Sequence, residues 1–330
     1  MALAFYLMVE TRVARWGKDG AVRGAEEPGL APGGGDGARR FEPGGSTKDA
    51  GHEVHIEYAL WGDVRDAPIL LLRPLGGSLQ LWEDLAKELA VHRRVIAFNP
   101  RGVGRSGPLH WSTSTRAMAA DARALLDHLG VDSCDVLGLS LGGMVATWFA
   151  IDSRDKLRNL VLVSTLLRPR AISARLLEHV TSLVKHAAGP QTEIEIHWLR
   201  HISGRLFRKQ KRTRAGTTEE TPQARRIKRE LRADPTPRRN LLIFLLCAFR
   251  HAPPELRNLK APTLLIFGDA DPVVGTRARL EIQQALPKAS VVVMPQAGHD
   301  LSLENPRELA RLVADFSREE GLPHIDGGAA

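Results

Sequence analysis

The sequence is poor in cysteine and contains no long apolar run. Two cysteines, Cys134 and Cys247, among 330 residues cannot form a disulfide framework, so we expect a reducing compartment and a core position for each. No stretch approaches the ~18 apolar residues of a membrane-spanning helix. The N-terminal apolar stretch has no basic residue before it and no clear cleavage site after it, which argues against a signal peptide. These absences favour a cytoplasmic protein.

Positive charge is in excess, and it is concentrated in one segment. The net charge is +8, and residues 200–239 hold fourteen Lys or Arg against four Asp or Glu. A solvated face is the usual interpretation of such a cluster. A patch for anionic substrates or for a membrane surface is an alternative, and nucleic acid is another. No recognised nucleic-acid-binding motif accompanies the charge, so no nucleic-acid partner is expected.

Composition divides the chain into three parts. Residues 1–50 are rich in Gly, Pro and charge and are expected to form a disordered extension. Residues 51–165 and 256–320 alternate short apolar runs with amphipathic segments, which predicts one α/β core. Residues 166–255 show helical patterns and no strand pattern. We therefore expect them to form a basic helical lid, inserted over the carboxyl edge of the sheet, where open α/β sheets bind ligands.

The fold class follows from the order of the elements in the core. Apolar runs bounded by Pro or Gly predict buried strands, and apolar residues spaced three and four apart predict helices. Strands alternating with helices indicate a mostly parallel sheet with helices on both faces. The expected strands cover residues 53–62, 67–74, 93–100, 134–138, 159–164, 262–268 and 290–295, and the expected helices cover 80–90, 112–130, 141–151, 276–286 and a segment from 305.

One serine stands where a strand gives way to a helix. Gly138, Ser140 and Gly142 form a Gly-x-Ser-x-Gly pentapeptide between two apolar segments. In such a nucleophile elbow the backbone turns so sharply that side chains two positions from the serine would collide, hence the glycines. The turn exposes the serine Oγ and brings the N–H of Leu141 to the positive end of the next helix, where it can face an oxyanion.

A serine hydroxyl needs a base, and the base needs a third group to hold it. The order typical of hydrolases places an acid and then a histidine after the serine, each on a loop that follows a strand. The strand at 262–268 leads to Asp269 and Asp271, and the strand at 290–295 leads to His299. The pattern alone leaves both aspartates open as the acid.

At these residues the sequence resembles the α/β-hydrolase superfamily. The resemblance covers roughly residues 53–318, and "PLGGSLQLW", "NPRGVGRS" and "GLSLGGMVATWFA" are similar to the esterase and 3-oxoadipate enol-lactonase-like subgroup. The family acid usually precedes a Pro, which favours Asp271 over Asp269, and the family Gly-His corresponds to Gly298-His299. Asn99 stands where the family generally has Asp.

The loop after the strand at 67–74 departs from the family pattern. Arg73-Pro74 replaces the usual His-Gly, whose loop contributes the second oxyanion N–H. Proline has no N–H, so the resemblance implies Leu75 as that donor, with Leu141 as its partner. Arg73 either anchors the loop, which is favoured, or meets a carboxylate of the substrate.

The resemblance implies a serine hydrolase that cleaves a carboxylic ester or lactone through Ser140, Asp271 and His299, without a cofactor. Cofactor-free perhydrolysis and carbon–carbon bond hydrolysis use the same triad, and a non-catalytic binding protein on the same fold is a further alternative. His197 and His201 have helical metal-ligand spacing, but the further ligands are missing nearby, so no metal site is expected. The sequence does not indicate the oligomeric state.

Overall fold

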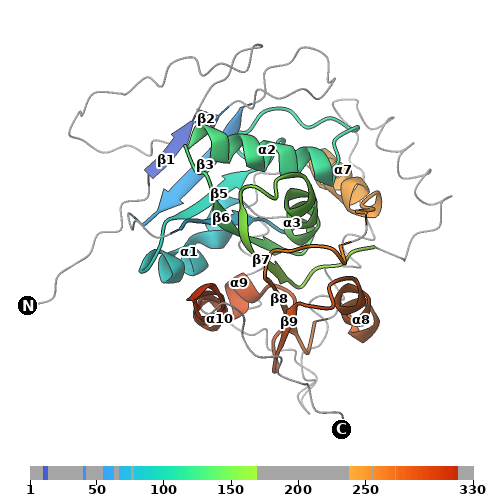
Figure 1. The fold of residues 1–330 in the computed structure, drawn as a ribbon. Helices are drawn as coiled ribbons and strands as arrows, with labels where there is room; N and C mark the ends of the chain where they lie inside the picture. The colour runs from blue at the N-terminus through green and yellow to red at the C-terminus, as the bar shows by residue number, and fades with distance from the viewer. Residues whose placement is uncertain are drawn as a thin grey trace, which may run out of the picture.

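A central sheet with helices on both faces forms the part of the chain that the structure describes (Figure 1). This computed structural model describes residues 10–13, 40–41, 55–62, 67–75, 78–168, 238–254, 256–271 and 273–318. The strands are β1 (Glu10–Val13), β2 (Arg40–Phe41), β3 (Ile56–Trp61), β4 (Ile69–Leu72), β5 (Val95–Asn99), β6 (Cys134–Leu139), β7 (Leu157–Val163), β8 (Thr263–Gly268) and β9 (Ser290–Met294). The helices are α1 (Glu83–Ala90), α2 (Thr115–His128), α3 (Leu141–Asp152), α7 (Arg238–Phe249), α8 (Thr276–Ala285), α9 (Leu301–Glu304) and α10 (Pro306–Arg318), with a 3-10 turn, η1 (Leu79–Trp82), before α1.

The strand order fixes where a ligand can bind. The sheet runs β1-β2-β3-β5-β4-β6-β7-β8-β9, and every neighbouring pair from β5 to β9 is parallel. From β4 the chain passes to β5 on one side and then returns to β6 on the other. In open α/β sheets such a reversal leaves a crevice at the carboxyl ends of the strands. The loops that follow β4 and β6 therefore meet at the expected place for a site.

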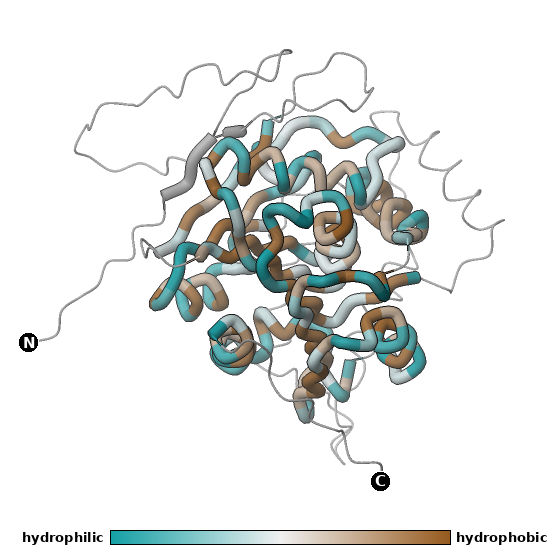
Figure 2. The backbone as a smooth tube through the Cα atoms, in the orientation of Figure 1, coloured by the Kyte–Doolittle hydropathy of each residue, from teal (hydrophilic) through white to brown (hydrophobic). Residues whose placement is uncertain are grey.

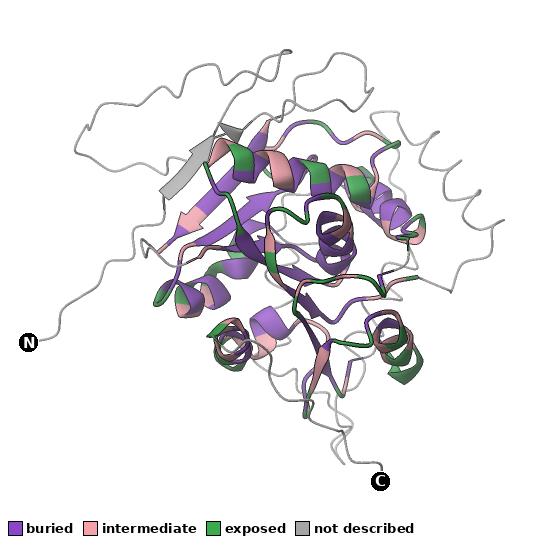
Figure 3. Ribbon diagram, viewed as in Figure 1, coloured by how far each residue is buried: buried purple, intermediate pink, exposed green. Residues whose placement is uncertain are grey.

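Both faces of the central strands are buried, which explains their nearly continuous apolar sequences. In β4, Leu70 and Leu72 belong to the core shared with α2, α3 and α7, and Ile69 and Leu71 to the core shared with α1 and α10. Hydropathy follows the same division, with apolar residues in the sheet and polar residues along the outer helices (Figure 2). Figure 3 shows the central strands buried and the outer sides of α2 and α8 exposed.

The expected α/β fold class is confirmed, and the elements end close to their predicted limits. Helix α2 begins after a hydroxyl cap, because the side chain of Ser114 accepts a hydrogen bond of 3.1 Å from the N–H of Ala117. Cys134 and Cys247 are both buried free thiols, as expected. Burial raises the pKa of each thiol to about 12.

The N-terminal segment differs from its prediction at two places. Residues 1–50 were expected to be disordered, but β1 and β2 lie within them and both pair antiparallel with β3. The sequence of β1, Glu-Thr-Arg-Val, contains none of the Gly and Pro that suggested disorder. Without β1 and β2, β3 would be the edge of the sheet, and an edge strand offers unpaired backbone N–H and C=O groups to any segment that can reach it.

The expected lid lies mostly outside the described residues. Residues 169–237 are not described, and they include nearly all of the basic cluster. Residues Arg238–Phe249 at the end of the expected lid form α7, a helix as predicted. It packs on the face of the sheet that α2 and α3 cover (Figure 1). The Nδ2 of Asn240 donates to the carbonyl of Gly102 at 2.8 Å, and the Sγ of Cys247 lies 2.9 Å from the carbonyl of Thr113. Both contacts join α7 to the loop between β5 and α2.

Candidate active site

Ser140 occupies a sharp turn between β6 and α3. Its backbone has φ 54° and ψ −114°, a conformation that costs a non-glycine residue about 1–3 kcal/mol. The Ser140 N–H donates to the carbonyl of Val163 at 2.9 Å, and the hydroxyl of Thr165 donates to the carbonyl of Ser140 at 2.6 Å. These bonds to the end of β7 hold the strained turn in place.

The glycines on either side of Ser140 are required by close backbone approach. A Cβ at Gly138 would collide with the carbonyl of Gly142, and a Cβ at Gly142 would collide with the carbonyl of Leu72. The steric role predicted for the elbow glycines is therefore present. A third glycine, Gly143, was not singled out in the sequence, although a Cβ there would lie 2.5 Å from the Cβ of Thr165.

The structure brings together the three side chains expected to act as a unit. Nε2 of His299 lies 3.0 Å from Oγ of Ser140, and Nδ1 of His299 lies 2.9 Å from Oδ2 of Asp271. The carboxylate can only accept, so Nδ1 carries the proton and Nε2 is free to accept the hydroxyl proton of Ser140. A hydroxyl, an imidazole and a carboxylate thus form one hydrogen-bonded chain, the arrangement that the sequence predicted.

Asp271, and not Asp269, faces the histidine. The other carboxylate oxygen of Asp271 accepts from the N–H groups of Val273 and Val274, at 2.7 and 3.0 Å. Burial raises the pKa of Asp271, but the hydrogen bonds from His299 and from these two N–H groups outweigh it, so the pKa lies below its ordinary value. Asp269 is exposed.

Arg279 of α8 braces the loop that carries Asp271. Its guanidinium donates to the carbonyl of Gly268 at 2.7 Å and to the carbonyl of Val274 at 3.2 Å, so it joins the two ends of the loop. The guanidinium also lies over the ring of Phe267, 5.9 Å from its centroid. Sequence reasoning did not find this residue, because nothing local in the sequence links position 279 to the acid loop.

The two expected oxyanion donors, Leu75 and Leu141, follow the carboxyl ends of β4 and β6, which are neighbours in the sheet. Leu141 is the first residue of α3, where backbone N–H groups have no acceptor within the helix. Leu75 follows β4 and packs against the core beside it. The contact between Gly142 and the carbonyl of Leu72 shows that the elbow and the end of β4 touch. Donation by Leu75 and Leu141 stays a prediction.

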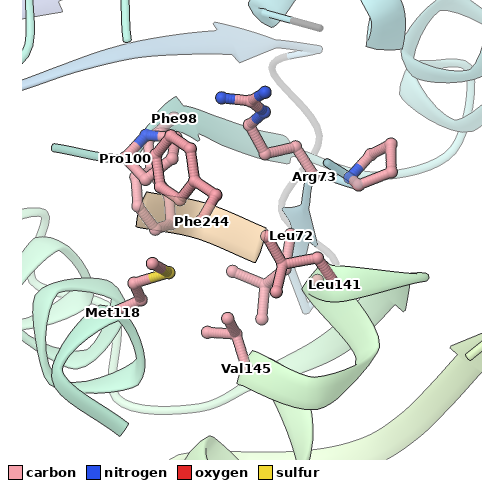
Figure 4. A pocket seen from close by; sticks show the side chains of 10 residues that line it. Leu72, Arg73, Phe98, Pro100, Met118, Leu141, Val145 and Phe244 are labelled. Carbon is pink, nitrogen blue, oxygen red and sulfur yellow. The ribbon is translucent and has the colours of Figure 1, made fainter. Parts of the chain in front are cut away.

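A mostly apolar pocket opens beside these loops (Figure 4). Figure 4 shows Met118 of α2 on one side of the pocket and Leu72 and Leu141 on the other, with Val145, one turn after Leu141 on α3, between them. The pocket is lined by Leu72, Arg73, Pro74, Phe98, Pro100, Met118, Leu141, Gly142, Val145 and Phe244. Leu141 lines this pocket and directly follows Ser140, so the pocket adjoins the elbow, although neither Ser140 nor His299 is among its lining residues.

Arg73, which departs from the family pattern, is buried at the edge of this pocket. Its guanidinium lies 5.5 Å from the centroid of the Phe244 ring. A cation over an aromatic face is attracted to it. The contact joins the loop after β4 to α7 and supports the anchoring role that the sequence favoured.

No metal site or membrane span appears in the described part of the chain. Within these residues no group of three or more His, Cys, Asp or Glu side chains is arranged to hold a metal ion. No helix of the described ranges is long and apolar enough to cross a bilayer. His197 and His201, which were not expected to bind a metal, lie outside the described residues.

The chain is similar along most of its length to proteins with related folds. It is 29% identical over 276 residues, 80% of this chain and 97% of the relative, to the "Putative carbamate hydrolase RutD" of Pseudomonas savastanoi pv. phaseolicola. It matches the structure of a thermophilic esterase from Thermogutta terrifontis with TM-score 0.70 and 24% identity, over 85% of this chain and 98% of that one. It matches the enol-lactonase from Burkholderia xenovorans with TM-score 0.67 and 21% identity, over 81% of this chain and 97% of that one.

The family model of the alpha/beta hydrolase fold matches residues 67–306, which is more than half of the chain. The match spans β4, the elbow at Ser140, the acid loop and the loop of His299. The chain therefore belongs to the α/β-hydrolase family.

Proposed function

We propose that the protein is a serine hydrolase that cleaves a carboxylic ester or a lactone through an acyl-enzyme on Ser140. The observation that carries the proposal is the hydrogen-bonded sequence from Ser140 through His299 to Asp271, with distances of 3.0 and 2.9 Å. The strained turn at Ser140 adds support, because such strain persists where the surrounding structure enforces it and is common at reactive residues.

The chemistry follows from these contacts. As Oγ of Ser140 bonds to the substrate carbonyl carbon, its proton passes to Nε2 of His299. The N–H groups of Leu75 and Leu141 bind the oxyanion that forms, a contribution of about 2.7–4 kcal/mol per donor. The C–O bond to the leaving group then breaks, and Nε2 gives its proton to the departing alkoxide. Water repeats the sequence on the acyl-enzyme and releases the acid.

The apolar pocket is the proposed binding place of the acyl group. It adjoins Leu141, which follows Ser140, and we place the acyl chain there with its carbonyl directed toward Oγ of Ser140. Its lining of Leu, Met, Val and Phe side chains favours an apolar chain. The substrate we propose is therefore a small molecule with an apolar acyl part.

Three other reactions could use the same three side chains and should be tested beside ester and lactone hydrolysis. A carbamate, the substrate class in the name of one relative, presents a carbonyl to the same hydroxyl. Perhydrolysis requires only that peroxide replaces water, and carbon–carbon hydrolysis uses the same triad. Epoxide hydrolases and haloalkane dehalogenases carry an aspartate at the elbow, so Ser140 argues against both.

The decisive experiment combines turnover with active-site labelling. Wild type and Ser140→Ala are assayed with p-nitrophenyl esters, lactones and aryl carbamates, and both are treated with a fluorophosphonate. We expect wild type to turn over an acyl substrate and to be labelled at Ser140, and the variant to lose at least ~10⁴-fold in rate. Equal turnover by both proteins would refute Ser140 as the nucleophile. Ligand binding without turnover or labelling would favour a binding protein.

A further inference from the structure

One side chain holds the backbone on both sides of His299. The histidine lies in the loop after β9, and the chain then forms a single turn of helix, α9, that ends at Glu304. Oε2 of Glu304 accepts from the N–H of Gly298 at 2.6 Å, and Oε1 accepts from the N–H of Asp300 at 3.1 Å. Both carboxylate oxygens therefore bind the peptide groups that flank the imidazole.

The glycine at residue 298 leaves room for this contact. A Cβ at Gly298 would lie 2.6 and 2.7 Å from the two carboxylate oxygens of Glu304. Such distances are shorter than van der Waals contact, so a larger residue would push the carboxylate off its two N–H groups. The glycine and the glutamate form one unit around His299.

The carboxylate is also an electrostatic neighbour of the imidazole. Burial raises the pKa of Glu304, while the N–H groups of Gly298 and Asp300 and the charge on His299 oppose the rise. The same applies to Asp300, where burial raises the pKa and the hydrogen bond from Ser302 opposes the rise. The charged groups near His299 in the described residues are thus Asp271 on Nδ1, with Asp300 and Glu304 behind the loop. A carboxylate there, when ionised, favours the imidazolium that forms when Ser140 attacks, whereas the raised pKa of Asp300 and of Glu304 works against ionisation.

We propose that Glu304 is a positioning residue for His299: its carboxylate fixes the backbone on both sides of the imidazole and its charge supports the imidazolium. The inference rests on the proposed function, since it assigns Glu304 a role in that reaction. Glu304 acts only through His299 and does not touch the substrate.

Two substitutions separate the geometric contribution of Glu304 from its electrostatic contribution. Glu304→Gln keeps the length of the side chain, but it removes the charge and sets an NH₂ group against a backbone N–H. Glu304→Asp keeps the charge and loses reach. Glu308→Gln is the matched control, because Glu308 lies exposed on α10 and bonds Arg311.

The test measures kcat, KM and the pH dependence of kcat/KM on the best acyl substrate, with the melting temperature of each variant. We expect Glu304→Gln to lower kcat about 10-fold with KM within about twofold of wild type. The acid limb of its profile should move to lower pH by about half a unit, because loss of a negative charge disfavours the imidazolium. Glu304→Asp should lower kcat and leave the acid limb in place.

The outcomes distinguish the two proposals. Wild-type kcat and an unmoved acid limb in a folded Glu304→Gln protein would overturn the positioning role, even with a lower melting temperature. If Glu304→Gln does not fold, Glu304→Asp decides the question. A kcat of Glu304→Asp equal to that of wild type would then overturn the role. If wild type and Glu308→Gln neither turn over acyl substrates nor label at Ser140, the proposed function fails and the role of Glu304 fails with it.

Discussion

The side-chain amide of Asn99 donates a hydrogen bond of 2.9 Å to Oε2 of Glu57, and both side chains are buried. The same carboxylate oxygen accepts from the N–H of Arg105 at 2.8 Å, and the side-chain carbonyl of Asn99 accepts from the N–H of Leu79 at 3.1 Å. The pair thus ties β3 and β5 to the loop before α2 and to the turn before α1. It explains why residue 99 departs from the aspartate of the family.

Asn99→Asp should destabilise the protein. The change sets a second carboxylate against Glu57 and removes a buried donor, which costs about 2 kcal/mol. Urea unfolding at neutral pH measures the loss, and Asn258→Asp at an exposed position should leave the stability unchanged. The double variant Glu57→Gln with Asn99→Asp should regain part of the loss. A fully stable Asn99→Asp protein would contradict this account of the pair.

Thr165→Val should weaken the elbow. Valine keeps the shape of the side chain and removes the hydroxyl that donates to the carbonyl of Ser140. We expect a loss of about 1 kcal/mol in the free energy of unfolding. With the turn less firmly held, kcat should fall by about fivefold while KM stays constant. Thr276→Val makes the same change at an exposed position and serves as the control; if it has the same effect, the elbow bond is not the cause.

Phe244→Leu should change the preference for acyl chain length. The ring of Phe244 lines the pocket, and a smaller side chain leaves room for about one more methylene, worth about 0.8 kcal/mol or roughly fourfold in rate. The ratio of kcat/KM for p-nitrophenyl hexanoate to that for the acetate should therefore rise. Leu280→Ala, on the exposed side of α8, should leave the ratio unchanged. An unchanged ratio in Phe244→Leu would place the acyl chain elsewhere.

His251 should make the protein sensitive to mild acid. Burial lowers the pKa of His251 from 6.5 to about 4, and its Nδ1 lies 3.0 Å from the hydroxyl of Thr115. The folded state therefore favours the neutral ring, so stability is complete above pH 6.5 and falls as the pH drops toward 4. Between pH 7 and pH 5 the loss is about 2 kcal/mol.

The measurement is the change in melting temperature between pH 7 and pH 5. His251→Gln cannot titrate, so its melting temperature should depend less on pH than that of wild type. His92 is exposed, and His92→Gln should keep the wild-type dependence. If His251→Gln loses as much stability in acid as wild type, then another group causes the loss.

Much of the fold and of the site could be predicted because the signals are local. Strand β6, the turn at Ser140 and helix α3 are contiguous, and the steric need for Gly138 and Gly142 follows from that turn alone. The end of β9 indicated His299, whereas the end of β8 left Asp269 and Asp271 open and the family resemblance favoured Asp271. In the structure His299 contacts both Asp271 and Ser140. Their catalytic roles stay predictions.

The supporting contacts could not be predicted, because each depends on how distant segments pack. Arg279 and Glu304 bond backbone groups of the loops that carry Asp271 and His299, and main-chain acceptors and donors leave no trace in side-chain patterns. The contact of Arg73 with Phe244 joins residues far apart in the chain. The strands within residues 1–50 were not predicted, because composition describes only the segment itself. It takes no account of β3, the strand with which β1 and β2 pair.

The burial of Cys134 and Cys247 has a practical consequence. The chain contains only these two cysteines, and both thiols stay protonated near neutral pH because burial raises the pKa of each to about 12. Since thiolates are the species that alkylating reagents attack, iodoacetamide and maleimides should spare the native protein. A cysteine introduced at an exposed position such as Trp111 would then be the single addressable thiol, and a fluorophore or spin label could be attached there without removing any native residue from the core.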